Sequence, residues 1–390
     1  MRKFKIFGFI VILLMVGALL FASLWSYNQI NLIPKFDTTN AKVVKPTNSQ
    51  ILSPVDNFPD QSSFLIFSVG SQGLAPGDGK RLGIGNGRAK MGDGLTDSIM
   101  LVLMNKANHK ISIISINRDM LVTSTGRRIN EAFNSGGITK FLDQIQELTG
   151  IRPEHQIRMN FAAFADMTDA FGGIDMNIPF AVSDTYAKLS ITQPGCVHLD
   201  GPTALAFARS RHWAILNSNG NYVADATSSD YGRIERQQSI VRAMLKKLIG
   251  PEIVSSFPGI LSAARSNITF DSGLSANSLL GLANTWKSGV AQINASTLPS
   301  RGVMLNGASV TLPEVQGIYE TIYKVTTKID FKLPSDWSGN SSIDTATLNS
   351  QISTESNSVA VANNKAWRPD HGTGLGGTQF SSCENGHLPN

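Results

Sequence analysis

The spacing of hydrophobic residues changes along this chain and predicts a different structure for each segment. The first apolar run, residues 6–25, carries no charge. Its length is that of a helix that spans a bilayer. Arg2, Lys3 and Lys5 precede the run, and positive residues are typical of the cytoplasmic side of such a helix. The pattern therefore predicts one transmembrane helix after a cytoplasmic end of residues 1–5.

A cleaved signal peptide is the alternative to this uncleaved anchor. The apolar part of a signal peptide is normally shorter, and no clear small-residue cleavage site follows the run. The anchor is therefore favoured, and it places the chain from Ser26 onward outside the cell membrane. Residues 26–60 are polar, with scattered prolines and asparagines, and are interpreted as a stalk.

Beyond the stalk, apolar runs of strand length alternate with stretches in which apolar residues recur at helical spacing. This alternation is typical of an α/β domain, here over residues 61–325. Strands are predicted at 64–69, 99–104, 111–116, 155–160, 174–178 and 290–298. Helices are predicted at 138–148, 161–171, 202–208, 230–248, 276–286 and 312–325. Residues 326–390 are rich in serine, asparagine, threonine and glycine, and are interpreted as a mobile tail.

Composition narrows the class of partner. The chain has 390 residues, enough for one large or two medium domains. Its net charge of +5 is mild and is spread along the sequence, so it does not by itself indicate nucleic-acid binding. The short cytoplasmic end holds no helix-turn-helix or basic patch. We therefore expect no nucleic-acid partner.

Four arginines lie in two close pairs between residues 209 and 238. Arg209 and Arg211 follow a predicted helix, whereas Arg233 and Arg236 belong to the first turns of the next one. Arginine can bind phosphate oxygens through two parallel hydrogen bonds, so four arginines in this stretch indicate a polyanion site. The alternative is a solvated basic face, which is the usual nature of a run of charge.

The second of these helices has two different faces. Ser229 or Asp230 begins it as the N-cap. At helical spacing, Asp230 shares one face with Arg233 and Gln237. The opposite stripe is apolar and is expected to face a core; it consists of Ile234, Val241, Leu245 and Leu248.

A second group of charges is predicted at one sheet edge. The strands 99–104 and 111–116 are joined by a short polar turn and form a hairpin. Asp97 precedes the first strand and Arg118 follows the second, so both lie at the edge away from the turn. Together they form either a structural ion pair or half of a metal–phosphate site. The glycine-rich stretch 71–94 could bring backbone N–H groups to phosphates, with a floppy insertion as the alternative.

These motifs, in this order and spacing, resemble those of the LytR-CpsA-Psr family, enzymes that attach glycopolymers to the Gram-positive cell wall. The resemblance covers about residues 61–325. The matching segments are 67–70, 96–100, 115–119, 128–130, 198–201, 208–211 and 230–238. The resemblance implies a central mixed β-sheet flanked by helices, in α-β-α layers, preceded by one transmembrane helix.

The resemblance also implies a phosphotransferase of the cell membrane with its catalytic domain outside the cell. The donor is a glycan on polyprenyl pyrophosphate, the acceptor is a hydroxyl group of peptidoglycan, and polyprenyl phosphate leaves. Fixed arginines and a metal ion stabilise the charge that develops on the leaving phosphate. Two alternative functions are a non-catalytic binder of lipid pyrophosphate or glycan that regulates wall assembly, and a polyprenyl-pyrophosphate phosphohydrolase.

Individual roles follow from the same resemblance. Asp97 is expected to bind Mg²⁺, and Asp230 to orient an arginine or to act as a base. The residues implied in catalysis are Arg118, Arg209, Arg211 and Asp230. The residues implied in pyrophosphate binding are Arg118, Arg128, Arg209, Arg211, Arg233, Arg236 and Gln237.

Two positions depart from the family's pattern. Gln72 replaces a second metal-binding aspartate, and Leu95 replaces an arginine. Asp93, Arg88 or Lys90 of the glycine-rich stretch could substitute, or metal binding is weak or absent. Because Mg²⁺ keeps several waters, one carboxylate together with pyrophosphate oxygens can suffice.

The chain has two cysteines, Cys196 and Cys383. Thiols outside the membrane tend to oxidise, so we expect a disulfide between them, with two free thiols as the alternative. The bond would fix the end of the tail against the segment that leads to Arg209.

Overall fold

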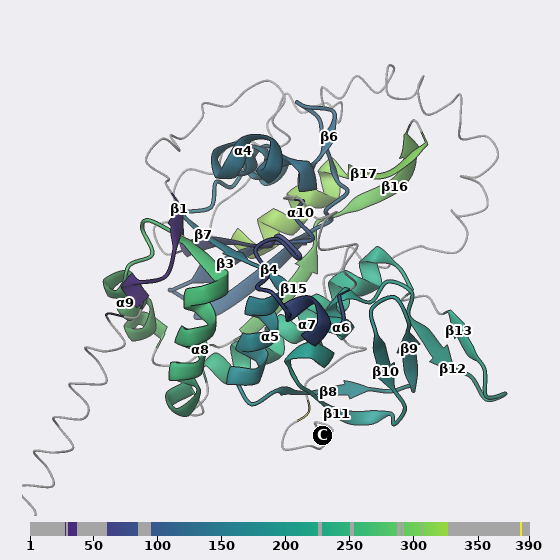
Figure 1. Cartoon of the computed structure of the whole chain (residues 1–390). Coiled ribbons are helices and arrows are strands. Elements are labelled where there is room, and N and C mark those ends of the chain that lie inside the picture. Colours follow the sequence, from purple (N-terminus) through teal and green to yellow (C-terminus); the bar gives the residue numbers. More distant parts are fainter. Residues whose placement is uncertain are drawn as a thin grey trace, which may run out of the picture.

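The computed structural model describes residues 28, 30–36, 61–84, 95–224, 228–249, 253–286, 290, 292–305, 307–326 and 383. Within these residues, a seven-stranded sheet lies between two layers of helices (Figure 1). Its strands, in spatial order, are β1 (Lys35–Phe36), β14 (Ile268–Asp271), β7 (His155–Met159), β2 (Gln61–Ser68), β3 (Ser98–Asn105), β4 (Lys110–Ile116) and β15 (Gln292–Thr297). The predicted α/β class with a central sheet is confirmed.

The sheet is mixed, as expected. β3 runs antiparallel to both β2 and β4, and Asn105 pairs with Lys110 at the turn of the predicted hairpin. The next pairings on either side of these three strands, β2–β7 and β4–β15, are parallel. Because the hairpin turn lies at one edge, the segments before β3 and after β4 meet at the opposite edge, where the site forms.

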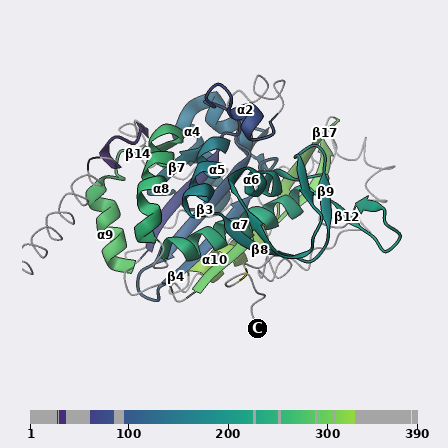
Figure 2. The same cartoon turned by 60° about the horizontal axis from the view of Figure 1, so that its bottom comes forward.

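Each face of the sheet has its own core, because successive side chains of a strand point to opposite faces. Leu65 and Phe67 pack on one side, and Phe64 and Ile66 pack on the other. Figure 2 shows α5 to α8 in front of the strands. The first face is covered by α4 (Ala132–Thr149) and α10 (Val315–Thr326), and the second by α5 (Phe161–Ala170), α7 (Asp230–Ile249), α8 (Ile253–Asn267) and α9 (Ala276–Trp286).

A smaller β-rich unit beside the main sheet was largely missed by the periodicity. Its strands have three to five residues, and such short strands give little alternation to detect. One buried core joins the unit to α6 (Gly201–Arg209) and to Trp213. The strands are β8 (Ile174–Ile178), β9 (Val182–Asp184), β10 (Leu189–Ile191), β11 (Gly195–Leu199), β12 (Ala214–Leu216) and β13 (Tyr222–Ala224).

Local residue chemistry explains where the helices near the site begin. The Asn160 side chain accepts a hydrogen bond from the Ala163 N–H at the start of α5 (2.9 Å), and Asp200 caps α6 through the Thr203 N–H (2.9 Å). For α7, the Ser229 hydroxyl accepts from the Gly232 N–H (3.1 Å). Ser229 is thus the cap, and Asp230 is left to make other contacts.

Short elements complete the described part of the chain. Residues 308–313 form β17, which pairs with β16 in a hairpin, so the helix predicted from residue 312 begins later, at Val315. These elements are α2 (Asp78–Arg81), β5 (Leu121–Val122), β6 (Arg127–Arg128), the 3₁₀ helix η1 (Ile129–Glu131), β16 (Ser300–Leu305) and β17 (Ala308–Pro313).

The predicted stalk is wrong for residues 30–36. Ile30 and Ile33 are buried, and β1 pairs in parallel with β14 at the edge of the main sheet. Only two residues pair, too few to give a strand signal within a polar segment. The predicted transmembrane helix (6–25), most of the stalk and most of the tail lie outside the described residues. Among the described residues, no helix is both long and apolar enough to cross a bilayer.

The expected disulfide is present between Cys196 and Cys383, whose Cα atoms lie 6.0 Å apart. Cys196 belongs to β11, and the N–H of Cys383 donates to the carbonyl oxygen of Asp175 in β8 (3.0 Å). The bond therefore fixes residue 383 to the small β-rich unit.

Removing this disulfide with the double variant Cys196→Ser/Cys383→Ser is expected to lower the melting temperature. The cysteines are 187 residues apart in sequence, and chain entropy for a loop of this size sets an upper limit of about 5 kcal/mol. Each kcal/mol lowers the Tm of a domain of this size by about 2–4 °C. Calorimetry measures the shift; an unchanged Tm, with the bond verified in the wild type by mass spectrometry, contradicts a stabilising role.

Candidate functional site

A cavity of about 590 Å³ lies between the main sheet and the helix layer of α5, α7 and α8. Most of its walls are apolar. From the sheet they include Met100, Met159 and Phe270, and from the helices they include Met167 and Leu245. Methionine and phenylalanine side chains of this kind adapt well to a flexible hydrocarbon ligand.

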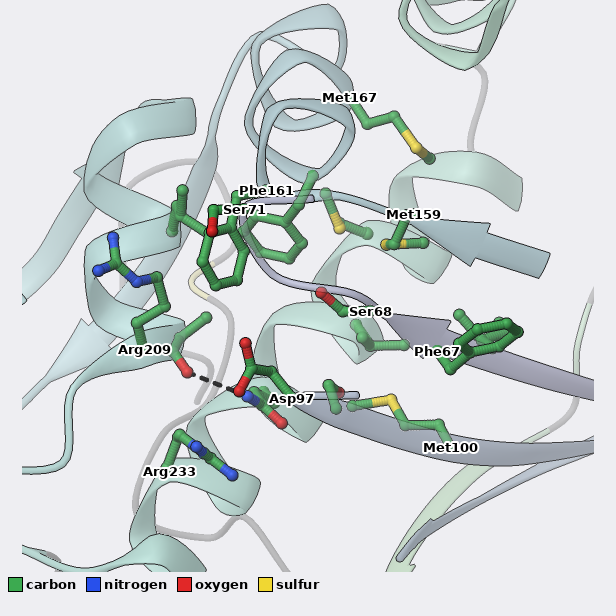
Figure 3. A pocket seen from close by; sticks show the side chains of 18 of the residues that line it. Phe67, Ser68, Ser71, Asp97, Met100, Met159, Phe161, Met167, Arg209 and Arg233 are labelled. Atoms are coloured by element: carbon green, nitrogen blue, oxygen red, sulfur yellow. Dashed lines mark hydrogen bonds between the residues drawn. The ribbon is translucent and has the colours of Figure 1, made fainter. Parts of the chain in front are cut away.

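One end of the cavity is charged. Figure 3 shows Asp97, Arg209 and Arg233 together at this end, with Met159 and Met167 further along. The same cavity therefore has a polar end, which we call the mouth, and an apolar part, which we call the interior. Its polar lining includes the predicted residues Asp97, Arg118, Arg209, Arg211, Arg233 and Gln237.

Asp97 and Arg118 meet at the predicted sheet edge, where Asp97 Oδ1 lies 2.6 Å from Arg118 Nη1. Asp119 adds a weaker ion pair to the same guanidinium group, 3.7 Å from its Nε. Burial lowers the pKa of Arg118, but the carboxylates of Asp97, Asp119 and Asp230 together raise it above its ordinary value. Arg118 therefore stays positively charged although it is mostly buried.

Two residues without a role in the sequence analysis shape this edge. Gly70 has a φ of 61°, and a Cβ there would lie 2.5 Å from the Asp97 carboxylate. Asn130 links the two charged segments, because its carbonyl oxygen accepts from the Thr96 N–H and its own N–H donates to the carbonyl of Arg118 (both 3.1 Å). Both residues belong to the matching motif segments, so the motif was the signal that could have found them.

Asp230 brings the two arginine segments together. Its Oδ1 lies 3.0 Å from Nη2 of Arg233 and 3.2 Å from Nε of Arg211. Arg233 is buried, and burial lowers the pKa of its guanidinium group. Asp230 pairs with both arginines and does not line the cavity. Its two expected roles, orienting an arginine or acting as a base, stay predictions.

Two further predicted residues, Arg209 and Gln237, line the cavity and contact neighbouring residues of its wall. The guanidinium carbon of Arg209 lies 5.0 Å from the ring centroid of Phe161, in a cation–π arrangement. The side-chain amide of Gln237 donates to the carbonyl oxygen of Ala208 (3.1 Å) and so ties α7 to the end of α6. Both contacts hold polar groups beside the apolar interior.

Arg236 and Arg128 do not line the cavity, so the structure does not bring them together with the other predicted pyrophosphate ligands, and their role in binding stays a prediction. Arg236 is fully buried; it donates to the carbonyl oxygen of Ser210 and lies 4.7 Å from the ring centroid of Trp213. Arg128 lies beside Asp119, with 3.9 Å between its Nε and Oδ1 of the carboxylate. Helical spacing placed Arg236 near the site, and the resemblance implied Arg128, but neither shows which way a long side chain points.

Sequence reasoning also missed Asp184, a buried carboxylate at the end of β9. Its Oδ2 accepts from the Ser210 hydroxyl (2.7 Å) and from the N–H groups of Arg211 (3.0 Å) and His212 (2.9 Å). Its Oδ1 accepts from the N–H groups of residues 186 (2.9 Å) and 187 (3.0 Å). Burial raises the pKa of Asp184, but these hydrogen bonds lower it by more. The net result is a pKa below the ordinary value of an aspartate.

The side chains at the mouth show which ligands the protein could offer to the expected metal ion. Among the described residues, no cluster of three His, Cys, Asp or Glu side chains could hold one. Gln72 and Leu95 are exposed, and the possible substitutes Asp93, Arg88 and Lys90 lie outside the described residues. Asp97, with the nearby hydroxyl groups of residues 68 and 98, fits Mg²⁺ in the mode where substrate oxygens and water supply most ligands.

Comparison with known proteins agrees with the fold and the motifs. Residues 36–327 match the LytR_cpsA_psr family, and the chain belongs to this family. The match begins at β1, which supports the correction of the predicted stalk.

Named relatives and a solved structure are similar to the chain. The polyisoprenyl-teichoic acid–peptidoglycan teichoic acid transferase TagU of Enterococcus faecalis is 25% identical over 78% of this chain and 89% of that protein. The probable cell wall biosynthesis protein LcpB of Corynebacterium glutamicum is 30% identical over 63% of this chain and only 52% of its own length. A LytR-Csp2A-Psr enzyme from Actinomyces oris has the same fold, with a TM-score of 0.54, 22% identity, and coverage of 73% of this chain and 97% of that one.

Asp184→Asn is expected to lower the free energy of unfolding at pH 7 and to weaken its dependence on acid pH. Because the folded-state pKa of Asp184 is below the ordinary 3.8, its stabilisation is present above that pH and is lost as the pH falls below it. Urea unfolding at pH 7 and pH 3 measures both effects. The exposed Glu314→Gln is the matched control, and an equal pH dependence of stability in wild type and Asp184→Asn contradicts the assignment.

Proposed function

We propose that this protein is a phosphotransferase that moves a glycopolymer from a polyprenyl-pyrophosphate carrier to peptidoglycan during cell wall assembly. One observation carries the proposal: a single cavity combines an arginine-rich mouth with an apolar interior. A lipid pyrophosphate has the same division into a charged head and an apolar tail. Family membership and the similarity to a transferase named for polyisoprenyl-linked teichoic acid support the proposal.

In this proposal the pyrophosphate binds at the mouth and the polyprenyl chain enters the apolar interior. Arg118, Arg209, Arg211, Arg233 and Gln237 supply donors around the phosphates. Charge-assisted hydrogen bonds from arginine are stronger than neutral ones, and partial burial strengthens them further. The carrier's tail then removes water from one side of the charged head.

The transfer step breaks one phosphorus–oxygen bond and forms another. The acceptor hydroxyl oxygen attacks the phosphorus next to the sugar and forms a phosphodiester, and its proton passes to solvent water. The bond from this phosphorus to the bridging oxygen breaks, and polyprenyl phosphate leaves with the electron pair. Negative charge grows on the leaving phosphate, so guanidinium groups that are already in place stabilise the transition state. Asp230 keeps Arg211 and Arg233 in that arrangement.

Mg²⁺ is part of the proposal, with Asp97 as its protein carboxylate. When bound, Mg²⁺ would neutralise part of the charge on the pyrophosphate. One Asp97 oxygen already pairs with Arg118, so the same residue fixes an arginine and would also be the carboxylate that holds the ion. This double use fits a site in which Gln72 takes the place of a second carboxylate.

We further propose that residues 6–25 anchor the chain as a single-pass membrane protein with the catalytic domain outside the cell. The run is apolar, uncharged and preceded by positive residues. The anchor would keep the cavity mouth near the membrane that holds the polyprenyl carrier, and within reach of peptidoglycan.

Product analysis tests the proposed function. Full-length protein in detergent is incubated with a polyprenyl pyrophosphate that carries a labelled glycan, and with peptidoglycan. We expect labelled glycan on peptidoglycan together with free polyprenyl phosphate. Free glycan phosphate as the sole labelled product indicates a phosphohydrolase, and binding without any product indicates a non-catalytic binder. Either of these results contradicts the proposal.

Arg209→Ala and Arg211→Ala are each expected to lower kcat/KM for transfer by about tenfold to a hundredfold or more. A hydrogen bond to a charged group contributes about 1.5–3 kcal/mol. Arg127→Ala is the control, because Arg127 is exposed and lies outside the cavity. Circular dichroism verifies folding, and near-normal turnover in both cavity variants shows that the arginines form a solvated surface instead.

Asp97→Asn is expected to lower activity and to be only partly rescued by excess Mg²⁺, because asparagine keeps an oxygen ligand but loses the charge. Asp119→Asn is the matched control: it removes a carboxylate from Arg118 but not from the cavity, so it should leave the Mg²⁺ dependence unchanged. Initial rates over a Mg²⁺ titration measure both. If excess chelator does not affect the wild type, the metal role is wrong and Asp97 acts as the ion-pair partner of Arg118.

A further inference from the structure

Two ring side chains are exposed at the cavity mouth. Tyr186 is 66% exposed although it lines the cavity, and its ring centroid lies 4.4 Å from that of His212. His212 also lines the cavity and is exposed, whereas the other aromatic lining residues within the described part of the chain are buried or half-buried. The ring pair therefore extends the site outward, away from the apolar interior.

The buried Asp184 carboxylate fixes this ring pair relative to the arginines. One of its oxygens accepts from the N–H of Tyr186, and the other accepts from the N–H groups of Arg211 and His212. The strands β9 and β10, which flank Tyr186, lie beside α6, the helix that ends at Arg209 (Figure 1). A ligand group held by Arg211 and a ring packed on Tyr186 are thus positioned by one side chain.

We propose that Tyr186 and His212 form a saccharide subsite that binds the sugar attached to the donor's pyrophosphate. This inference rests on the proposed function, because the sugar must be linked to a phosphate held by the arginines. If the lipid tail fills the interior, the sugar leaves the phosphate on the side of the mouth. The face of a pyranose ring presents C–H groups, which pack well on an aromatic face with its negative charge density. The phenol hydroxyl and imidazole nitrogens can bond sugar hydroxyl groups.

With such a subsite, the enzyme would recognise the first sugar of the donor as well as its pyrophosphate. The arginines respond to phosphate charge, so they give no preference for a glycosylated carrier over a bare one. A ring contact beside them favours the carrier that holds a glycan and disfavours the spent polyprenyl phosphate. Tyr186 and His212 would therefore contribute substrate specificity, while the arginines contribute charge stabilisation.

The test compares two ligands on the same protein: farnesyl pyrophosphate, and farnesyl pyrophosphate that carries one N-acetylglucosamine. The ratio of the two affinities in full-length wild type is the reference, because the bare ligand carries more negative charge and the sugar contact shows as a change in this ratio. Tyr186→Ala should weaken binding of the glycosylated ligand by about two- to tenfold, the range expected for one aromatic contact, and should leave farnesyl pyrophosphate unaffected. Tyr186→Phe keeps the ring and should retain most of the sugar-dependent affinity. Arg211→Ala should weaken both ligands.

Other outcomes overturn the inference in distinguishable ways. Equal weakening of both ligands by Tyr186→Ala shows that the residue supports the arginine segment instead of binding a sugar. Unchanged affinity for both shows that the ring pair makes no contact. A defect seen only in the KM for peptidoglycan assigns the ring pair to the acceptor and overturns its assignment to the donor. If the wild type binds neither ligand, the proposed function itself fails, and the subsite fails with it.

Discussion

Like charges repel, and this site depends on keeping several arginines close together at the end of an apolar cavity. The carboxylate of Asp230 makes that possible, because it lies within 3.2 Å of both Arg211 and Arg233. Asp97 does the same for Arg118. Burial alone lowers the pKa of Arg118, and the nearby carboxylates more than reverse this effect. The arginines are thus charged and fixed before a ligand arrives, which is the condition for electrostatic stabilisation of a transition state.

The backbone around these charges is held by further polar groups, of which Asp184 lines the cavity and Arg236 does not. Both residues bind the turn after α6. Arg236 donates to the Ser210 carbonyl oxygen, and Asp184 accepts from the backbone N–H groups of Arg211 and His212. Asn130 joins the segments of Asp97 and Arg118 in the same manner. A rigid site built on such contacts needs little rearrangement on binding. The arginines that are expected to bind the ligand are thus held in position by other residues.

The sequence predicted five of the seven strands of the main sheet because these strands are long and apolar, and it missed the short β1 and β14. It placed Asp97 beside Arg118 because hairpin geometry leaves no other edge for them. It could not assign Arg236, since helical spacing places a residue near a site without showing which way a long side chain turns. Asp184 and β1 were missed for a related reason: a short strand carries little periodicity. Their roles come from tertiary contacts between segments that are distant in the sequence.

The central claim is that one cavity holds both the charged head and the apolar tail of a lipid pyrophosphate. Photo-crosslinking tests it most directly, with full-length protein and a polyprenyl pyrophosphate that carries a diazirine at the far end of its chain. Mass spectrometry should find the label on interior residues such as Met159, Met167 or Phe270, and unlabelled polyprenyl pyrophosphate should compete it away. Label found only on the outer surface, or label that unlabelled ligand does not displace, would contradict the account.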